Sequence, residues 1–443
     1  MTIKKYSYSV PRGFRSFGAV AVATALSLGA LGAAPVQAER RTFVPADVFE
    51  RHLIWLGLDS GEPDNYVPTK NIINVKSLDL SNLRDLGKED GLTGLDDFRS
   101  LEHLNLSNIT EAYSLSLGGM RGGLLNSRGS NLRTINLSGS KFESIDIQGS
   151  RLTSIDLSGN VNIETLRLNY GTLESINLRG ATNLASLELI GNKLTSIDLS
   201  TQSKLTSLNV TNNRLTSIDL GSMPELENFN AATNRLTSVD FSKNTNLESI
   251  EVSNNRLTAV NVTNLPMLGY LAASYNRITS VDTSKNPHLE TLSMASNRLK
   301  SIDLSANTEL DWLWLDSNKL RTLDVSTLSR LQYLSAPLNR ISKLSVKDNP
   351  NLQLLNVANN PISTLDVKSN DQLFSLDIRN TPIRTLDLRN TLFEINEGGF
   401  WFGDSAMGLD SRGTRAKVLV DNPAAARLKW QSRTGENVTY ATK

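Results

Sequence analysis

Residues 205–220 read LTSLNVTNNRLTSIDL, and the pattern returns 21 residues later as LENFNAATNRLTSVDF over residues 226–241. Each stretch holds two short segments in which apolar and polar residues alternate, separated by a cluster that contains asparagine. Such alternation over four to six residues indicates short strands, and the Asn-rich clusters indicate turns. One unit of this length cannot bury its own apolar side. Successive units are therefore expected to stack and to share one continuous core.

The period is constant over most of the chain. The apolar register begins at Phe142 and its last unit begins at Leu373, which gives twelve units of equal length, with looser copies at 75–80, 101–106 and 132–137. These units predict a β-rich solenoid with two faces of short parallel strands. Each asparagine is expected at a bend, bonding backbone groups of its own and the next coil. An asparagine recurs every 21 residues at Asn192, Asn213, Asn234, Asn255, Asn276, Asn297, Asn318, Asn339 and Asn360.

Composition and missing motifs exclude much chemistry. The chain has 46 Lys and Arg against 45 Asp and Glu, so it lacks the basic excess of a nucleic-acid binder. It has no cysteine and three histidines, which leaves no disulfide, thiolate nucleophile or Cys-ligated zinc. A phosphate-binding loop, a nucleophile elbow and a zinc-protease motif are also missing from the sequence. We therefore expect a protein that is not an enzyme and binds no cofactor or metal.

The ends of the chain differ from the repeats. Residues 1–38 are predicted to be a signal peptide, with a basic leader, an apolar stretch at 18–34 and a cleavage site after Ala38. The alternative is an uncleaved membrane anchor. Residues 39–74 are expected to form an N-terminal cap with a helix inside 43–58, and residues 75–390 the solenoid. Residues 391–443 are expected to form a C-terminal cap or tail, with Phe400–Phe402 sealing the last coil and a strand at 417–420.

The L-x-x-L-x-L-x-x-N-x-L segment is the leucine-rich-repeat signature. The full unit resembles the bacterial 21-residue class with a nested ten-plus-eleven period (the IRREKO type), whose second half reads L-x-x-L-D-L. That half stands here as Leu194–Ser200 and as Leu215–Leu220, and the match covers about residues 75–390. The resemblance implies a secreted or surface protein that binds other macromolecules, as internalin-like proteins do. It also implies a bacterial source, because secreted animal leucine-rich ectodomains usually have Cys-rich caps.

Two rows of like charges follow the repeat. One interpretation is that solvent and opposite-charge neighbours stabilise them. The alternative is an envelope protein that binds anionic wall polymer along its basic row, with cation binding at the acidic row as a further option. The basic row follows the asparagines and consists of Lys193, Arg214, Arg235, Arg256, Arg277, Arg298, Lys319 and Arg340. The acidic row consists of Asp198, Asp219, Asp240, Asp282, Asp303, Asp324, Asp366 and Asp387, interrupted by Asn261 and Ser345.

The candidate site lies where the repeat departs from its own template. Outward positions fall two, four and six residues after the first Leu of each unit, and most hold small or polar residues, such as Ser207 and Asn209. Across five adjacent units the first outward position reads Tyr, Thr, Trp, Tyr and Leu, and the second supplies a further Trp. These large residues predict a patch for a protein or glycan partner, with the Asp316 carboxylate at its rim. The alternatives are incidental surface aromatics, or contact with a cap or a second copy. The predicted partner-binding residues are Tyr270, Trp312, Trp314, Asp316, Tyr333 and Leu354.

Overall fold

The protein is described by a computed structural model that covers residues 39–86, 91–110 and 113–389, with three short strands at 409–410, 416–419 and 438–441. Residue contacts divide the chain into two units, Met1–Glu39 and Arg40–Lys443, and the second is described below. The signal peptide expected at 1–38 and the aromatic seal expected at Phe400–Phe402 lie outside the described residues. None of the described helices is both long and apolar enough to cross a membrane.

The N-terminal part combines an antiparallel pair of strands with two helices. Strand β1 (Arg41–Phe43) pairs antiparallel with β2 (Tyr66–Pro68), next to α2 (Thr69–Ile72). The helix expected inside 43–58 is α1 (Asp47–Trp55), and its Phe49 and Leu53 side chains are fully buried. The carboxylate of Glu50 accepts the backbone N–H groups of Asp64 and Asn65, both at 2.8 Å. A buried carboxylate thus fixes the loop that returns to β2.

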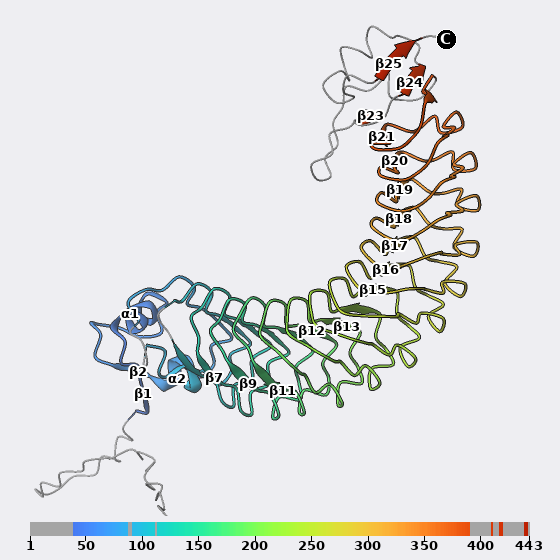
Figure 1. Cartoon of the computed structure of the whole chain (residues 1–443). Helices are drawn as coiled ribbons and strands as arrows, with labels where there is room; N and C mark the ends of the chain where they lie inside the picture. The colour runs from blue at the N-terminus through green and yellow to red at the C-terminus, as the bar shows by residue number, and fades with distance from the viewer. Residues whose placement is uncertain are drawn as a thin grey trace, which may run out of the picture. The chain divides into compact units, whose positions relative to one another are not determined.

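One parallel sheet of 16 strands carries one strand from each coil of the array, β23 completing it at one edge. Partners in the regular repeats lie 21 residues apart, as for Ser207 and Asn228. Figure 1 shows strands β12 to β21 following one another in chain order along the stack. The strands are β3 (Ser77–Asp79), β4 (His103–Asn105), β6 (Leu124–Asn126), β8 (Ser144–Asp146), β10 (Thr165–Arg167), β12 (Ser186–Glu188), β13 (Ser207–Asn209), β14 (Asn228–Asn230), β15 (Ser249–Glu251), β16 (Tyr270–Ala272), β17 (Thr291–Ser293), β18 (Trp312–Trp314), β19 (Tyr333–Ser335), β20 (Leu354–Asn356), β21 (Ser375–Asp377) and β23 (Leu409–Asp410).

The expected solenoid is confirmed, but its second strand face is confined to the two ends of the array. Between residues 178 and 384, the second half of each coil contains no strand. There the coils are joined by isolated backbone bonds, such as the 2.8 Å bond from the N–H of Arg214 to the oxygen of Leu194. Second-face pairing occurs between β5 (Ser114–Ser116) and β7 (Thr134–Asn136), between β9 (Ser154–Asp156) and β11 (Ser175–Asn177), and among β22 (Thr385–Asp387), β24 (Ala416–Leu419) and β25 (Val438–Ala441).

The repeated apolar residues form the core, and the repeated asparagines satisfy the backbone beside it. The Nδ2 group of Asn255 donates to the oxygens of Val252 at 3.1 Å and Ser253 at 3.2 Å in its own coil. It also donates to Ala231 at 2.9 Å in the preceding coil. Its Oδ1 accepts the N–H of Leu236 at 2.9 Å. The expected backbone bonds are confirmed, with the preceding coil as the neighbour instead of the next one.

A second polar column, which the repeat pattern did not predict, crosses the opposite turn. The Nδ2 group of Asn244 donates to Leu220 at 3.0 Å and Met223 at 2.7 Å in the preceding coil. Asparagine or glutamine fills this position in seven of the described coils, and Ala181, Met223 or a leucine fills it in others. The mixture of polar and apolar residues hides the column in the sequence. The polar members are Asn160, Gln202, Asn244, Asn286, Asn307, Asn349 and Asn370.

Asn255→Ala should lower the free energy of unfolding by about 1–3 kcal/mol, because it leaves buried backbone groups of two coils without partners. Denaturant unfolding would measure the loss. Thr258→Ala is the matched control, since Thr258 lies in the same coil, is exposed and makes no side-chain hydrogen bond among the described residues. Equal unfolding curves for Asn255→Ala and the control would contradict this role of the asparagine.

Candidate partner-binding face

Four of the six predicted site residues lie in one column on the outward side of the main sheet. The other two are Trp314, which lies in the next column between Ser293 and Ser335, and Asp316, two residues further along the coil. Pairing places Tyr270 opposite Thr291, Thr291 opposite Trp312, Trp312 opposite Tyr333, and Tyr333 opposite Leu354. The column forms because the 21-residue repeat holds each coil in the same register. Because neighbouring strands lie about 4.8 Å apart, adjacent members of the column are within contact distance.

Three aromatic rings form a compact cluster, two of them from this column and the third, Trp314, from the next. The rings of Trp312 and Tyr333 are stacked, with centroids 3.7 Å apart and an angle of 11° between their planes. The ring of Trp314 lies 5.4 Å from that of Trp312, tilted by 31°. All three side chains are partly exposed, whereas Leu313 between the tryptophans is fully buried. The outward register of the tryptophans is therefore confirmed. We call Trp312, Trp314 and Tyr333 the aromatic cluster.

The two ends of the column differ from the aromatic cluster. Thr291 separates Tyr270 from Trp312, so Tyr270 is not in ring contact with the cluster. The Tyr270 hydroxyl donates to the Oε2 atom of Glu251 at 3.3 Å. Burial, together with the Glu251 charge and that hydrogen bond, raises the pKa of Tyr270 to about 12. At the other end, Leu354 is partly exposed beside Tyr333.

Asp316 lies deeper than the rim position that the sequence suggested. The Ser335 hydroxyl on the neighbouring strand β19 donates to its Oδ1 atom at 2.8 Å. Its Oδ2 atom is closed from solvent and has no hydrogen-bond partner among the described residues. This burial raises the pKa of Asp316 above its ordinary value. The face therefore carries a carboxylate in which one oxygen accepts a hydrogen bond and the other has no hydrogen-bond partner among the described residues.

The basic row consists of side chains that the described part of the chain leaves unpaired. Seven of its eight members are exposed, and Lys193 is partly exposed. None of the eight forms an ion pair or a side-chain hydrogen bond with a described residue. These side chains therefore face solvent as expected, but among the described residues no opposite charge lies within ion-pair distance of them. Only the backbone is engaged, as in the 2.9 Å bond from the N–H of Arg256 to the oxygen of Leu236.

The acidic row has a structural explanation. Asp282 Oδ1 accepts the backbone N–H of Ser284 at 3.0 Å, and the same contact recurs along the row and at Asn261. Such a bond closes a local turn. The Ser284 N–H, followed by its hydroxyl, lowers the pKa of Asp282. The row thus satisfies backbone donors just after the second apolar segment of the coils, both where a second-face strand is missing and at Asp387, which lies in β22. The same bond is formed by Asp198, Asp219, Asp240, Asp303, Asp324, Asp366 and Asp387.

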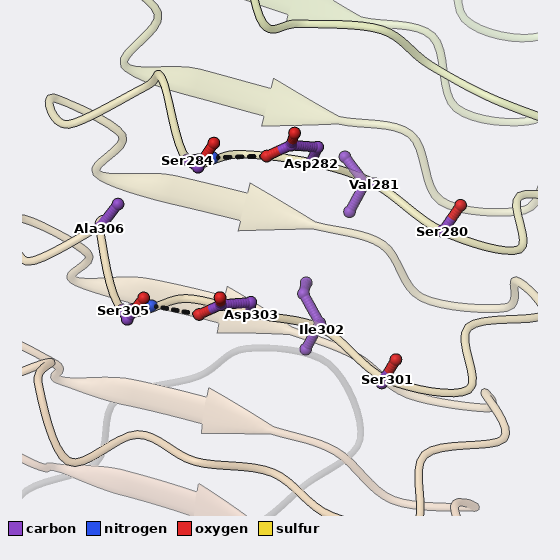
Figure 2. A pocket seen from close by; sticks show the side chains of 9 residues that line it. All are labelled: Ser280, Val281, Asp282, Ser284, Ser301, Ile302, Asp303, Ser305 and Ala306. Carbon is purple, nitrogen blue, oxygen red and sulfur yellow. Dashed lines mark hydrogen bonds between the residues drawn. The ribbon is translucent and has the colours of Figure 1, made fainter.

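A pocket of about 330 Å³ opens between two coils at this row. Asp282 and Asp303 line it, and Figure 2 shows both carboxylates bonded to the backbone of Ser284 and Ser305. Among the described residues, no group of three or more histidines and carboxylates is placed to hold a metal ion. The carboxylates of this pocket are thus already engaged in closing turns.

Comparisons with solved structures agree with the geometry. The functional domain of InlJ from Listeria monocytogenes, which includes a cysteine ladder, is 24% identical, covers 79% of this chain and 78% of its own length, and aligns with a TM-score of 0.63. A leucine-rich-repeat protein of Leptospira interrogans is 18% identical, covers 84% of this chain and 97% of its own, and has a TM-score of 0.56. No protein-family model and no curated protein matches the sequence.

These likenesses define the class of fold. The chain is a leucine-rich-repeat solenoid, and its coils of about 21 residues fit the internalin-like form of that fold. Unlike the Listeria domain, which includes a cysteine ladder, it contains no cysteine. Its repeated polar residue is asparagine.

The two kinds of carboxylate should respond to pH with opposite sign. Asp316 has a raised pKa, so its favourable contribution to stability is present below the unfolded value of about 3.9 and is lost as pH rises through the folded value. The stability of Asp316→Asn relative to wild type should therefore increase between about pH 3 and pH 7. Thermal unfolding across that range would measure the difference.

Asp282→Asn is the control of opposite sign. The lowered pKa of Asp282 gives stability that is present above the unfolded value and is lost on acidification. This variant should become less stable relative to wild type as pH rises. The same trend in both variants would contradict the assigned environments.

Proposed function

We propose that this protein is secreted or displayed at the cell surface and binds a macromolecule of a host or neighbouring cell without catalysing a reaction. The contact surface is the outward face of β16 to β20. The proposal rests on one observation. Most outward positions hold small or polar residues such as Ser207, whereas the aromatic cluster places three large rings there. Export is supported by the basic leader, the apolar stretch and the cleavage motif of residues 1–38.

The cluster has the properties of an interface anchor. Tryptophan and tyrosine supply large contact areas and are enriched among residues whose truncation costs the most binding energy. Stacking on Tyr333 holds Trp312 in place before any partner arrives. Less side-chain freedom then has to be lost on binding. The paired strands beneath keep the anchors at fixed spacing.

Trp314→Ala should weaken partner binding by about 2 kcal/mol or more, because a central aromatic anchor is lost. Trp312→Ala should have a similar effect. The partner would be isolated from protein and glycan arrays with the chain beginning at residue 39, and its affinity measured by calorimetry. The melting temperature should barely move for Trp314→Ala. Trp312→Ala also removes the stack on Tyr333, which is worth about 0.5–1.5 kcal/mol.

Ser207→Ala is the matched control, because Ser207 has the same outward position on β13 and makes no side-chain hydrogen bond among the described residues. Asn209 is unsuitable, since its Oδ1 atom accepts the N–H of Thr211 at 3.1 Å. Wild-type affinity in both tryptophan variants would show that the partner site does not lie on this face.

A second candidate function rests on the unpaired basic row. Eight consecutive coils each present one Lys or Arg, at intervals of about 4.8 Å, without an acidic partner among the described residues. Arginine, which fills six of these positions, matches carboxylate and phosphate groups in a bidentate manner. The row would suit a linear anionic polymer such as one of the cell wall. In this case the protein has a structural role in the envelope.

Replacing Arg235, Arg256 and Arg277 with Gln should weaken polymer binding and make it less sensitive to salt, because fewer counterions are released. Affinity for isolated wall polymer, titrated from about 50 to 200 mM salt, would show this. Lys141, Lys243 and Lys285→Gln is the control of equal charge, taken from exposed lysines outside the row. Equal losses in the two triple variants would exclude the row as a specific site.

A further inference from the structure

The outward face around the aromatic cluster has one sign of charge. Seven coils lie along this face, from the one that begins at Leu226 to the one that begins at Leu352. In none of them does a Lys, Arg or His occupy the position one, two, four or six residues after the first leucine. Acidic residues occupy six of these positions: Glu227, Glu248, Glu251, Glu290, Asp311 and Asp316.

Only part of this negative charge is compensated by the protein itself. Arg330, in the turn before β19, pairs with Asp311 at 3.1 Å and with Glu309 at 3.5 Å. Glu251 accepts a hydrogen bond from the Tyr270 hydroxyl. Asp316 accepts the Ser335 hydroxyl on Oδ1. This carboxylate, two residues beyond Trp314, thus has no cationic partner within ion-pair distance among the described residues, and neither have Glu227, Glu248 and Glu290.

The ring faces of the cluster add to the same preference. An aromatic face attracts a cation, and tryptophan does so most strongly. Among the described residues, arginine lies over the rings of Tyr66 and Tyr113, but no cation lies over the cluster. Trp314 and Asp316 both project from the outward side, two residues apart along the coil. A guanidinium or ammonium group placed there meets a π face and lies near the Asp316 carboxylate, whose Oδ2 atom is closed from solvent.

We propose that the partner segment docking on β16 to β20 is a basic polypeptide that places an Arg or Lys side chain against Trp312 and Trp314, near Asp316. This inference rests on the proposed function and names the chemistry of the partner. The acidic residues around the cluster attract a basic segment and repel an anionic glycan. An anionic polymer would instead be drawn to the basic row, which lies at the following bend of each coil.

The test uses three short probes of equal length: acetylated amides of tetra-arginine, tetra-citrulline and tetra-glutamate. Citrulline keeps the shape of arginine without its charge. In calorimetric titrations at about 20 mM salt, where surface charges are weakly screened, tetra-arginine should bind at least about tenfold more tightly than either other probe. Asp316→Asn and Trp314→Ala should each weaken tetra-arginine binding by about three- to tenfold, as the loss of one cation contact implies.

The double variant Asp282→Asn with Asp303→Asn is the control, because it removes two carboxylates that lie outside this face. It should bind tetra-arginine as wild type does. Asparagine at 316 keeps an acceptor for the Ser335 hydroxyl, and a melting curve would confirm that the variant is folded. The inference is overturned if tetra-citrulline binds equally well, or if the control loses as much affinity as Asp316→Asn.

The two proposals can fail separately. One outcome is that Trp314→Ala abolishes binding of a partner isolated from the arrays, while tetra-arginine binds the Trp314 and Asp316 variants as it binds wild type. In that case the face binds a partner, and the inference that the partner is basic is wrong. If tetra-arginine binding depends on Trp314 and Asp316 while the isolated partner ignores Trp312 and Trp314, the cation preference stands and the proposed partner site is wrong.

Discussion

The structure depends on hydrogen bonds from one asparagine, buried or half-buried, that recurs in nine coils and bonds the backbone of two coils. A coil of 21 residues has to bend sharply, and each bend leaves backbone groups that no strand can pair. The amide of Asn255 meets three carbonyl oxygens and one N–H, so it closes its own bend and fixes it to the preceding one. Because the contact repeats, every coil has the same register, and the sheet above it stays continuous.

This constraint separates residues that build the coil from residues that are free to vary. Asp282 and its equivalents carry charge, yet each closes a turn by accepting the backbone N–H of the residue two positions later. The side chains of the basic row close no turn, because their guanidinium and ammonium groups form no hydrogen bond or ion pair with a described residue. The aromatic cluster likewise contributes no inward contact, although Trp312 and Tyr333 stack on each other. Charge and aromatic surface that the fold does not need are the basis of both binding proposals.

Much of the fold could be predicted because the repeat sets period, register and inward residues together. The column from Tyr270 to Leu354 followed from spacing alone. The absence of strands from the second half of the coils between residues 178 and 384 could not be predicted, because L-x-x-L-D-L alternates like a strand. The second polar column was missed because Met223 and leucines share positions with Asn244. An Asp followed two residues later by Ser is a turn signal, and it could have explained the acidic row.

The depth of Asp316 could not be read from one coil, since it depends on Ser335 of the next. The same holds for the charge of the face, which emerges only when seven coils are placed side by side. Hydroxyl-radical footprinting with a bound partner would show directly which side chains the partner covers. Trp312, Trp314 and Tyr333 should become protected, while the exposed Tyr170 should not change. Protection of Tyr170 with unchanged tryptophans would contradict the proposed site.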